Sequence, residues 1–548
     1  MRSAGTSPPQ RARLFLIFCI VVAVASGIFF RFANLGGKFY YDDEVASALH
    51  ESGHTAAQFA GFFDGRVRSA SYIVSYFQKH TGSPFDTIRA LADDDPQHPP
   101  LFYLANQYWT HLVGQSIADQ RSLAALFGAA AIAATFWFGL GLYRSVPMAG
   151  VLTAIVAVSP FHVIYSQQNR EYSAWFFFLV LCSALLLRAL DNPSAWRWIV
   201  YGSFLALALY TSALLLLSVV SFGIYVGLTE RRWSASAVRF VLATGIALAA
   251  YVPWLAVMIR GSSLVLHWPG PAIHAVSARI YILKGLFNTG TVFFDMEYER
   301  TYLVPVLLVI LMLILASLIV LARGPMRVKT FVFAIVIVPL VAFVIPDLLH
   351  NTSHGIYARY FVPVWFGYEL AVAYLIGLLV LSRSSVAQRF LGATLFLMII
   401  ASGIASDIKN EAAPETWAAA HMSRLGVFGR AINADTNPLV VYVHDGSHWD
   451  ISVAGLTTVV RPDVRMQLFG GLRDVRVASS RFFLFNANQQ TKDQLDRTMR
   501  GRWIKIDSGT VDVGSAIVHQ LQAEAATERA GQHVSDGGES PLWEHLPS

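Results

Sequence analysis

Three carboxylates follow two tyrosines in the stretch Phe39-Tyr40-Tyr41-Asp42-Asp43-Glu44, directly after the first apolar segment. Acidic side chains beside a membrane are not attracted by anionic headgroups, so another partner must explain them. A carboxylate can act as a general base towards a hydroxyl group, and it can also hold a divalent cation. The alternative is that these acids only cap and charge the first turn of a helix.

A second acidic stretch is Asp93-Asp94-Asp95-Pro96-Gln97-His98-Pro99-Pro100. We interpret it as a second acidic wall, in which Asp95 and His98 are polar contacts for a substrate. The alternative is a solvated turn before a helix. The two prolines predict the start of an amphipathic helix over 101–113, and its Tyr and Trp residues favour a position at the membrane surface.

Two arginines stand where a phosphate group can be bound, each at an end of an apolar segment. Arg170 lies in Tyr165-Ser-Gln-Gln-Asn-Arg-Glu-Tyr172, and Arg359 directly precedes Tyr360. A guanidinium group suits phosphate because its planar fork donates two hydrogen bonds to paired oxygens. The alternative is that both side chains only extend to the membrane surface. We expect Arg170, Tyr172, Arg359 and Tyr360 to contact an anionic part of the substrate.

Composition predicts an all-α polytopic membrane protein. Hydrophobic residues make up 55% of the 548 residues and charged residues 14%, against about 25% charged residues in soluble proteins. Apolar runs of roughly 17–25 residues are long enough to cross ~30 Å of hydrocarbon. They predict about 11 transmembrane helices, near 14–32, 121–143, 147–165, 172–190, 197–212, 213–229, 239–258, 301–322, 329–347, 361–381 and 390–406. Glu369 is the one carboxylate in the interior of these spans; it is either functional or hydrogen-bonded to a neighbouring helix.

The short loops predict the orientation. Every second connection is short and basic, which is typical of the cytoplasmic side. The N-terminus is therefore expected in the cytoplasm and the C-terminal region outside, provided that the run 197–229 is two spans. The first segment lacks a small-residue cleavage site, so we interpret it as a retained anchor. Cys19 and Cys182 both lie in apolar runs and offer no disulfide framework.

The chain divides into three expected regions. Residues 1–406 form a transmembrane domain whose first outer loop spans 33–120. Residues 407–521 are expected to form a soluble mixed α/β domain, with short strands at 439–444, 481–486 and 516–521. Residues 522–548 are expected to be a flexible tail. A nucleotide-binding glycine loop is absent from the sequence, and we expect no nucleic-acid partner.

In these motifs the chain resembles the GT-C-type membrane glycosyltransferases that use polyprenyl-phosphate sugars. This class includes the protein mannosyltransferases and the lipid A aminoarabinose transferases. The similarity extends over roughly residues 10–405 and leaves out the 407–521 domain. It rests on Asp43-Glu44 after the first span, His98-Pro-Pro-Leu-Phe-Tyr103, the run from Ser159 to Tyr172, and Arg359-Tyr-Phe-Val-Pro363.

The resemblance implies inversion at the sugar carbon and a catalytic first outer loop. It implies that Asp43 is the base. Asp42 is an extra neighbour in this chain, and we expect Asp42 and Tyr41 to be substrate contacts. Glu44 is expected to position the acceptor or a cation. Relatives have Gln-Glu-Ala-Arg where this chain has Gln167-Gln-Asn-Arg170, so a metal ligand borrowed from position 168 has no support. Metal ligands stay unknown, and a divalent cation is a candidate cofactor only.

The resulting hypothesis is a transferase in the bacterial inner membrane, with its C-terminal domain in the periplasm. It would move a sugar from a polyprenyl-phosphate donor to a hydroxyl group of a glycan, lipid or protein acceptor. A transporter or flippase for a lipid-linked glycan is one alternative, which requires broken or polar helices at the membrane midplane. A polysaccharide ligase or polymerase is another, which favours a late outer loop such as 347–360.

Overall fold

The computed structural model describes residues 10–79, 82–231, 233–261, 277–295, 300–350, 352–381, 385–414, 425–444, 451–472, 475–485, 489–498, 501–506 and 542–547. The chain forms two compact units. The first unit comprises Met1–Leu35, Arg121–Ala256 and His274–Ala412. The second comprises Gly36–Gln120, Val257–Ile273 and Ala413–Ser548. The first outer loop and the C-terminal region therefore belong to one unit.

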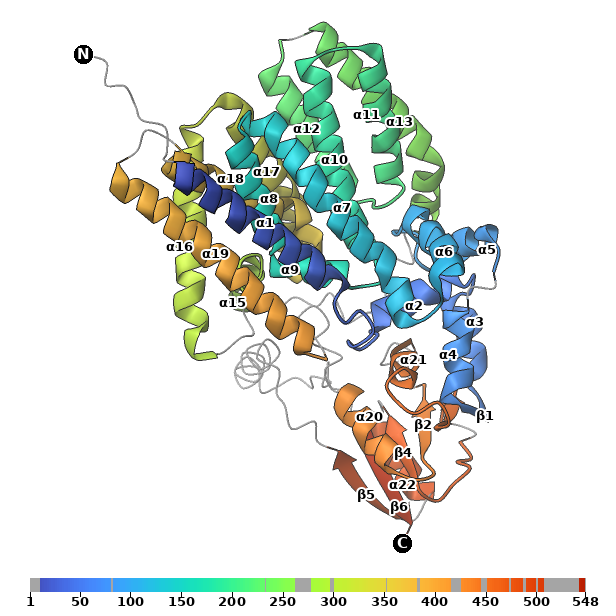
Figure 1. Ribbon diagram of the computed structural model, residues 1–548. Helices are drawn as coiled ribbons and strands as arrows, with labels where there is room; N and C mark the ends of the chain where they lie inside the picture. The colour runs from blue at the N-terminus through green and yellow to red at the C-terminus, as the bar shows by residue number, and fades with distance from the viewer. Residues whose placement is uncertain are drawn as a thin grey trace, which may run out of the picture. The chain divides into compact units, whose positions relative to one another are not determined.

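The first unit is built from helices (Figure 1). Its long segments are helices because lipid offers the backbone polar groups no hydrogen-bond partners outside the helix itself. Its elements are α1 (Gln10–Phe32), α7 (Ile117–Tyr143), α8 (Val146–Ala157), α9 (Pro160–Ser166), α10 (Tyr172–Asp191), α11 (Ala195–Leu209), α12 (Leu215–Thr229), α13 (Ala235–Arg260), α15 (Ala278–Gly290), α16 (Arg300–Ala322), α17 (Met326–His350), η2 (His354–Ile356), η3 (Ala358–Phe361), α18 (Val362–Leu381) and α19 (Val386–Ala412).

Eight helices in the described part of the chain are long and apolar enough to cross a membrane. A ninth candidate is the pair α8 and α9, which bends by 58° at a short break. The helices α11 and α12 are apolar but shorter. The expected division of 197–229 is confirmed, because α11 ends at Leu209 and α12 begins at Leu215. The expected class, a polytopic helical membrane protein with a C-terminal mixed α/β region, is also confirmed.

Small residues allow the helices of the first unit to approach closely. Helix α1 packs against α8 and α19, as Figure 1 shows. A Cβ atom at Gly27 of α1 would collide with the carbonyl group of Ala157, and one at Gly403 of α19 with that of Val158. Both glycines thus face the break between α8 and α9. Close backbone approach at glycine is typical of helix packing in membranes.

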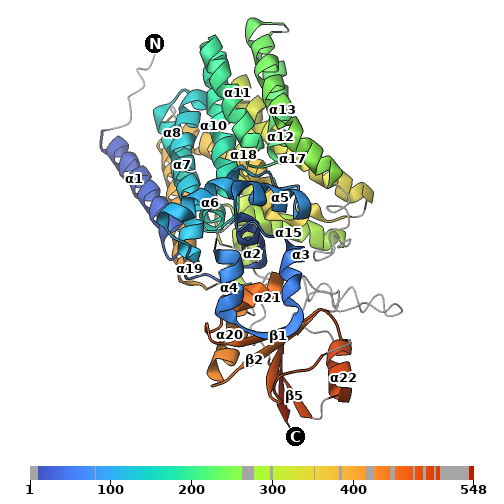
Figure 2. The ribbon, with the colours of Figure 1, turned by 90° about the vertical axis from the view of Figure 1, so that its right-hand side faces the viewer.

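The second unit combines short helices with a mixed sheet (Figure 2). Helix α2 places Asp42–Glu44 in its first turn, and five further helical segments of the first outer loop follow it. The elements of this unit are α2 (Asp42–Glu51), α3 (Ala56–Phe59), η1 (Ala60–Phe62), β1 (Asp64–Ser69), α4 (Ala70–Gln78), α5 (Pro84–Asp94), α6 (Leu101–Val113), α20 (Leu425–Ala434), β2 (Leu439–Val443), α21 (Ile451–Thr457), β3 (Arg465–Phe469), β4 (Phe482–Phe485), α22 (Gln489–Thr498), β5 (Gly501–Ile506) and β6 (Leu542–Pro547).

The six strands are ordered β1-β3-β2-β4-β6-β5. The central strand β2 runs parallel to both β3 and β4, and its five residues are all buried, as expected for a strand covered on both faces. The expected strands at 439–444 and 481–486 are confirmed as β2 and β4. The expected strand at 516–521 lies outside the described residues. Strand β6 falls within 522–548, the range for which a flexible tail was expected.

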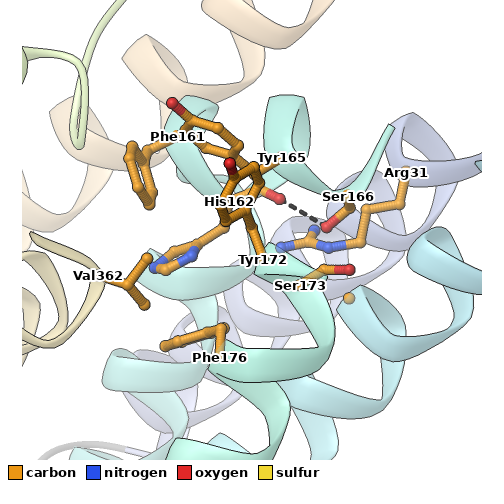
Figure 3. Close-up of a pocket in the computed structure, with 10 residues that line it drawn as sticks. Arg31, Phe161, His162, Tyr165, Ser166, Tyr172, Ser173, Phe176 and Val362 are labelled. Atoms are coloured by element: carbon orange, nitrogen blue, oxygen red, sulfur yellow. Dashed lines mark hydrogen bonds between the residues drawn. The ribbon is translucent and has the colours of Figure 1, made fainter. Parts of the chain in front are cut away.

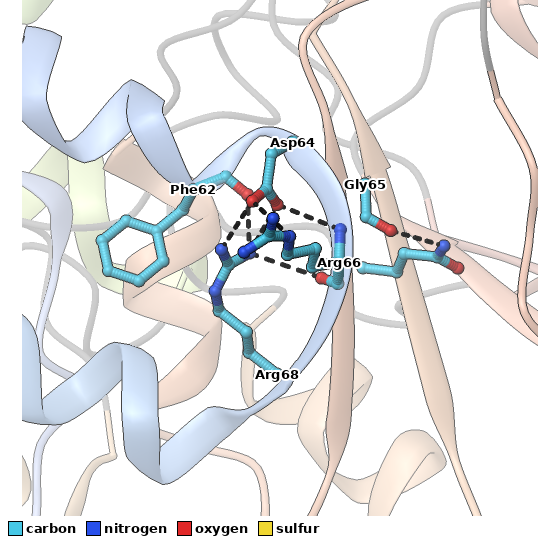
Figure 4. A network of polar contacts seen from close by, with 6 residues as sticks. Phe62, Asp64, Gly65, Arg66 and Arg68 are labelled. Atoms are coloured by element: carbon cyan, nitrogen blue, oxygen red, sulfur yellow. Dashed lines mark hydrogen bonds and ion pairs between the residues drawn. The ribbon is translucent and has the colours of Figure 1, made fainter.

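Strand β1 comes from the first outer loop and pairs antiparallel with β3 of the C-terminal region. Its register shifts between Asp64 and Val67, where Gly65 has φ +74°. A side chain at Gly65 would be strained in this conformation. Asp64 accepts two hydrogen bonds from Arg68, at 2.7 and 2.8 Å (Figure 4). This ion pair stiffens the turn that leads into β1.

Hydrogen bonds from Arg68 lower the pKa of Asp64 from its ordinary value of 3.8 to about 2. A carboxyl group whose pKa is lower in the folded than in the unfolded protein stabilises the fold at pH values above its unfolded pKa. This contribution is lost as the pH falls from about 4 to about 2. The pair is partly exposed, so we expect its contribution to stay below about 1 kcal/mol. Thermal unfolding between pH 5 and pH 2 should show a slightly smaller loss of stability for Asp64→Asn than for the parent protein. An equal loss in both would mean that the pair does not contribute.

Candidate active site

The first acidic stretch forms the N-terminal turn of α2. Tyr41 is the N-cap, and its carbonyl oxygen accepts hydrogen bonds from the backbone N–H groups of Glu44 and Val45, both at 2.9 Å. Asp42 also accepts a bond from the N–H of Asp43, at 3.1 Å. The positive end of the helix dipole favours ionised carboxylates in this turn. The capping alternative and the functional reading therefore describe the same three residues.

The three acids differ in how far their side chains are buried. Asp42 and Asp43 are half-buried, whereas the side chain of Glu44 is fully buried. Tyr41 is also buried, which leaves its expected contact with a substrate a prediction. The neighbouring Tyr40 donates a hydrogen bond to the side-chain oxygen of Gln120, at 2.5 Å. Within α2, Asp42 and Asp43 are thus the carboxylates that a ligand can reach from solvent.

The second acidic stretch packs against the same helix. Helix α2 contacts both α5 and α6, and His50 of α2 lies 3.3 Å from Asp94 at the end of α5. Asp94 also accepts a bond from the N–H of Ala56, at 2.5 Å. Asp94 therefore holds the loop together. The second acidic stretch thus contacts the C-terminal half of α2, through His50.

The two substrate contacts expected in this stretch lie close to each other. Asp95 ends α5 and is buried. The ring nitrogen Nε2 of His98 lies 3.6 Å from its carboxylate, and the N–H of His98 donates to the carbonyl oxygen of Asp95 at 3.0 Å. The ring of His98 meets Tyr103 edge to face at 6.3 Å. Their role as substrate contacts stays a prediction.

A buried carboxylate that the sequence did not single out joins α2 to α6. Glu51 is fully buried, and the side-chain amide of Asn106 lies 3.1 Å from both of its carboxylate oxygens. The backbone of Glu51 is also bonded to α5, because the hydroxyl group of Thr87 donates to the carbonyl oxygen of Glu51 at 3.3 Å. Nothing in the local sequence marks Glu51, because its partners lie far away along the chain.

Arg170 belongs to the first unit and is almost fully enclosed there. It is 4% exposed, lies 3.6 Å from the carboxylate of Glu171, and stacks over the ring of Tyr172 at 5.7 Å. The whole run from Ser159 to Tyr172 is buried. The simple alternative, a side chain that extends to the membrane surface, is therefore wrong for Arg170.

Arg359 lies in the other loop of interest in the first unit. It is half-buried and stacks over the rings of Tyr357 and Tyr360, at 5.0 and 5.6 Å. The loop is anchored by Asp347, whose carboxylate accepts bonds from Tyr281 at 2.9 Å and from the N–H of Gly355 at 2.6 Å. The two aromatic rings lie against the guanidinium group of Arg359 and help to hold its plane.

A pocket in the first unit contains a charged residue that the sequence analysis overlooked (Figure 3). Arg31 of α1 is 1% exposed and donates to the carbonyl groups of Ala157 at 2.6 Å and Val156 at 3.3 Å, at the break after α8. These carbonyl groups lack partners within α8, so a cation stabilises the end of that helix. The pocket is lined by Arg31, Gly128, Phe161, His162, Tyr165, Ser166, Tyr172, Ser173, Phe176 and Val362.

Glu369 has its partner on a neighbouring helix. Its carboxylate lies 3.0 Å from Nε2 of His162 in α9, and both side chains are buried. The ring of His162 stacks on Phe176 at 4.0 Å. The hydrogen-bonding alternative for Glu369 is therefore confirmed, and the pair links α9 to α18.

Among the described residues, no group of three or more His, Cys, Asp or Glu side chains has the arrangement of a metal site. The ring nitrogen Nδ1 of His354 lies 3.0 Å from the carboxylate of Asp347. The acids of the second unit remain the residues with the right chemistry to hold a divalent cation.

Comparison with solved structures shows which fold this is. The ArnT protein from Cupriavidus metallidurans in the apo state aligns over 91% of this chain and 97% of its own, with a TM-score of 0.51 and 13% identity. The same protein bound to undecaprenyl phosphate gives a TM-score of 0.49 at 13% identity, over 90% and 96%. The Archaeoglobus fulgidus oligosaccharyltransferase tethered with an acceptor peptide gives 0.45 at 12% identity, over 90% and 69%.

Sequence comparison adds no relative: no family model matches the chain, and no curated protein matches it either. The likeness to apo ArnT is one of fold, because 13% identity transfers no residue roles. It covers nearly the whole of both chains, including the C-terminal region that the sequence motifs left out. The chain thus has the GT-C-type fold, in which a bundle of membrane helices is combined with a soluble region.

Proposed function

We propose that the protein is an inverting glycosyltransferase that moves a sugar from a polyprenyl-phosphate donor to an acceptor hydroxyl group. Asp43 takes the proton of this hydroxyl group as its oxygen bonds to the anomeric carbon. The bond from that carbon to the phosphate oxygen breaks, and polyprenyl phosphate leaves with the bonding electrons. The observation that carries the proposal is the pair of half-buried carboxylates Asp42 and Asp43 at the N-terminus of α2, in a chain with the ArnT fold.

Glu44 is proposed to act from within the second unit, because its side chain is fully buried. It would position the turn that carries Asp43, and with it the acceptor. Asp95 and His98 are proposed as acceptor contacts beside α2, which packs against α5. A glycan, a lipid and a protein hydroxyl group all fit this chemistry.

The phosphate is proposed to meet Arg359 and Arg170. Negative charge builds up on the leaving oxygen, and a prepositioned cation lowers the barrier most where charge develops. Arg359 is the more exposed of the two, so we propose it as the first contact of the donor. Tyr360 and Tyr172 keep each guanidinium plane fixed by stacking.

Release of free polyprenyl phosphate tests the proposed reaction. Purified protein in lipid nanodiscs would receive a lipid donor labelled in both the sugar and the isoprenoid chain, with a membrane extract as the source of acceptor. We expect the sugar label to leave the lipid, and free polyprenyl phosphate that carries only the isoprenoid label to appear. A donor that stays intact in every extract would overturn the proposal.

One observation favours a second candidate, a transporter for a lipid-linked glycan. Broken helices and buried charges at membrane depth are typical of transporters, and α8 and α9 form a broken pair beside Arg31 and the His162–Glu369 pair. The same experiment separates the two candidates. A transporter would move the intact donor across the bilayer without release of polyprenyl phosphate.

We also propose that the second unit faces the periplasm. The pairing of β1 with β3 supports one part of this proposal, because two strands of a sheet must lie on the same side of a membrane. Cysteines introduced at Arg66 and Asp463, whose side chains are 82% and 70% exposed, should both react with an impermeant thiol reagent in intact spheroplasts. The natural cysteines are buried and serve as the background. Labelling of both only after lysis would reverse the proposed orientation.

A further inference from the structure

The segment that enters α2 is attached to the C-terminal region of the same unit. The backbone N–H of Phe39 donates to the carbonyl oxygen of Pro414, at 2.9 Å. The ring of Phe39 lies against Gly426 at the start of α20, where a Cβ atom would collide with the ring. Phe39 is three residues before Asp42. The segment that leads to the acidic turn is therefore bonded through its backbone to Pro414 and touches α20 through the ring of Phe39.

The body of α2 is enclosed by the C-terminal region as well. Val45 and Leu49 of α2 are buried in one hydrophobic core with Phe428 of α20 and Ile451 and Leu456 of α21. Helix α2 packs directly on α21 and on α4. Burial of a large apolar side chain stabilises such packing by about 1.5–3 kcal/mol. The apolar side chains of α2 thus pack on residues about 400 positions away along the chain.

The other end of α2 is held through β1 and α4. The hydroxyl group of Ser52 donates to the carbonyl oxygen of Phe77 in α4, at 2.8 Å. Strand β1, which precedes α4, is extended beyond its ladder by a bond from the N–H of Ala70 to Val464, at 2.8 Å. The buried amide of Gln467 in β3 donates to the carbonyl oxygen of Gly65, also at 2.8 Å. Both ends of α2 are therefore fastened to one C-terminal scaffold.

We infer that the C-terminal region is the positioning element for the acidic turn, and that the contact of Phe39 with Gly426 sets the position of Asp42 and Asp43. This inference assigns a role to a region that carries none of the proposed catalytic residues. It rests on the proposed function for its activity readout only. Phe39 and Gly426 are positioning residues, since they act through the backbone of the acidic turn.

Gly426→Ala tests the inference because the added methyl group must push the ring of Phe39 away. Alanine is the better helix former, so helix propensity cannot cause a loss. We expect single-turnover transfer to slow about 10- to 100-fold, the cost of a misplacement near 1 Å, with donor affinity unchanged. The matched control is Gly61→Ala, because an added methyl group at Gly61 of η1 meets no atom within 4 Å.

Hydrogen–deuterium exchange supplies a readout that does not depend on activity. We expect faster exchange over residues 40–51 in Gly426→Ala and unchanged exchange in Gly61→Ala. Phe39→Leu in the Gly426→Ala background makes room for the methyl group and should restore part of both the protection and the transfer rate. If Gly426→Ala does not fold, Phe39→Leu alone should loosen residues 40–51 in the same way.

Unchanged exchange over residues 40–51 and unchanged transfer in Gly426→Ala would overturn the inference. Equal additive losses in the double variant would overturn it too, because coupled residues are non-additive. The proposed function fails separately, when the parent protein releases no polyprenyl phosphate from the labelled donor in any extract. In that case the exchange experiment still decides whether the C-terminal region holds α2.

Discussion

Asp43→Asn should slow the chemical step of sugar transfer by at least ~100-fold, the lower range for general-base assistance. Asparagine is nearly isosteric with aspartate but cannot take the proton of the acceptor hydroxyl group. The N-cap of α2 is Tyr41, so the substitution removes one charge that the helix dipole favours, worth about 0.3–1 kcal/mol, and leaves the cap in place. Donor affinity should therefore change little, and the loss should appear in single-turnover transfer.

The matched control is Asp42→Asn, which removes an equally half-buried carboxylate one residue earlier. Asp42 accepts the N–H of Asp43, and an amide oxygen can replace that contact, so the loss should be far smaller. Both variants would be measured side by side for single-turnover transfer and donor binding. A severe loss in Asp42→Asn with normal transfer in Asp43→Asn would move the base by one residue. Normal transfer in both would remove α2 from the active site.

Arg359→Ala and Arg170→Ala should each reduce transfer by one to two orders of magnitude, if each phosphate contact contributes about 1.5–3 kcal/mol. Lysine at either position keeps the charge but loses the paired hydrogen bonds, so Arg→Lys should retain part of the activity. Arg170→Ala should lower the free energy of unfolding more than Arg359→Ala does. Arg170 is buried beside Glu171, and its removal leaves a carboxylate without its cation, whereas Arg359 is half-buried.

Arg144→Ala is a suitable control for both arginines. Its side chain is 68% exposed and pairs with Asp191 in the first unit, far along the chain from both loops. Thermal unfolding of each variant, followed in detergent, separates loss of structure from loss of transfer. Folded Arg359→Ala and Arg170→Ala proteins with normal donor affinity and normal transfer would remove both side chains from the phosphate site.

The membrane helices could be predicted from the sequence because their signal is local. A run of apolar residues predicts a membrane span without information from the rest of the chain. Even the boundary between the short helices α11 and α12 was predicted, at Tyr210–Ser212. The acidic turn was found for a similar reason. Asp42, Asp43 and Glu44 are adjacent in sequence, and helix N-termini favour acids.

The features that escaped prediction are non-local. The strand β1 reads Asp-Gly-Arg-Val-Arg-Ser, which lacks the alternation of a half-buried strand, and it is a strand because β3 pairs with it. Arg31 stands near the end of the first span, where an arginine ordinarily extends to the membrane surface. The break after α8 gives it buried carbonyl groups of another helix to bind. The role of His162 is likewise non-local, because its partner Glu369 comes from α18.

The pairing of Asp64 with Phe469 in the β1–β3 ladder has a consequence for biosynthesis. A ribosome that adds 5–20 residues per second needs roughly 20–80 s to pass from one partner to the other. Throughout that interval the first outer loop has been made while the strand that completes its sheet has not. The edge of β1 is then a template for wrong pairing, and its Asp, Gly and two Arg residues make it a poor one. A chain that stops before β3 therefore lacks the strand that completes the sheet of the first outer loop. Translation must pass β3 before the proposed active site can form.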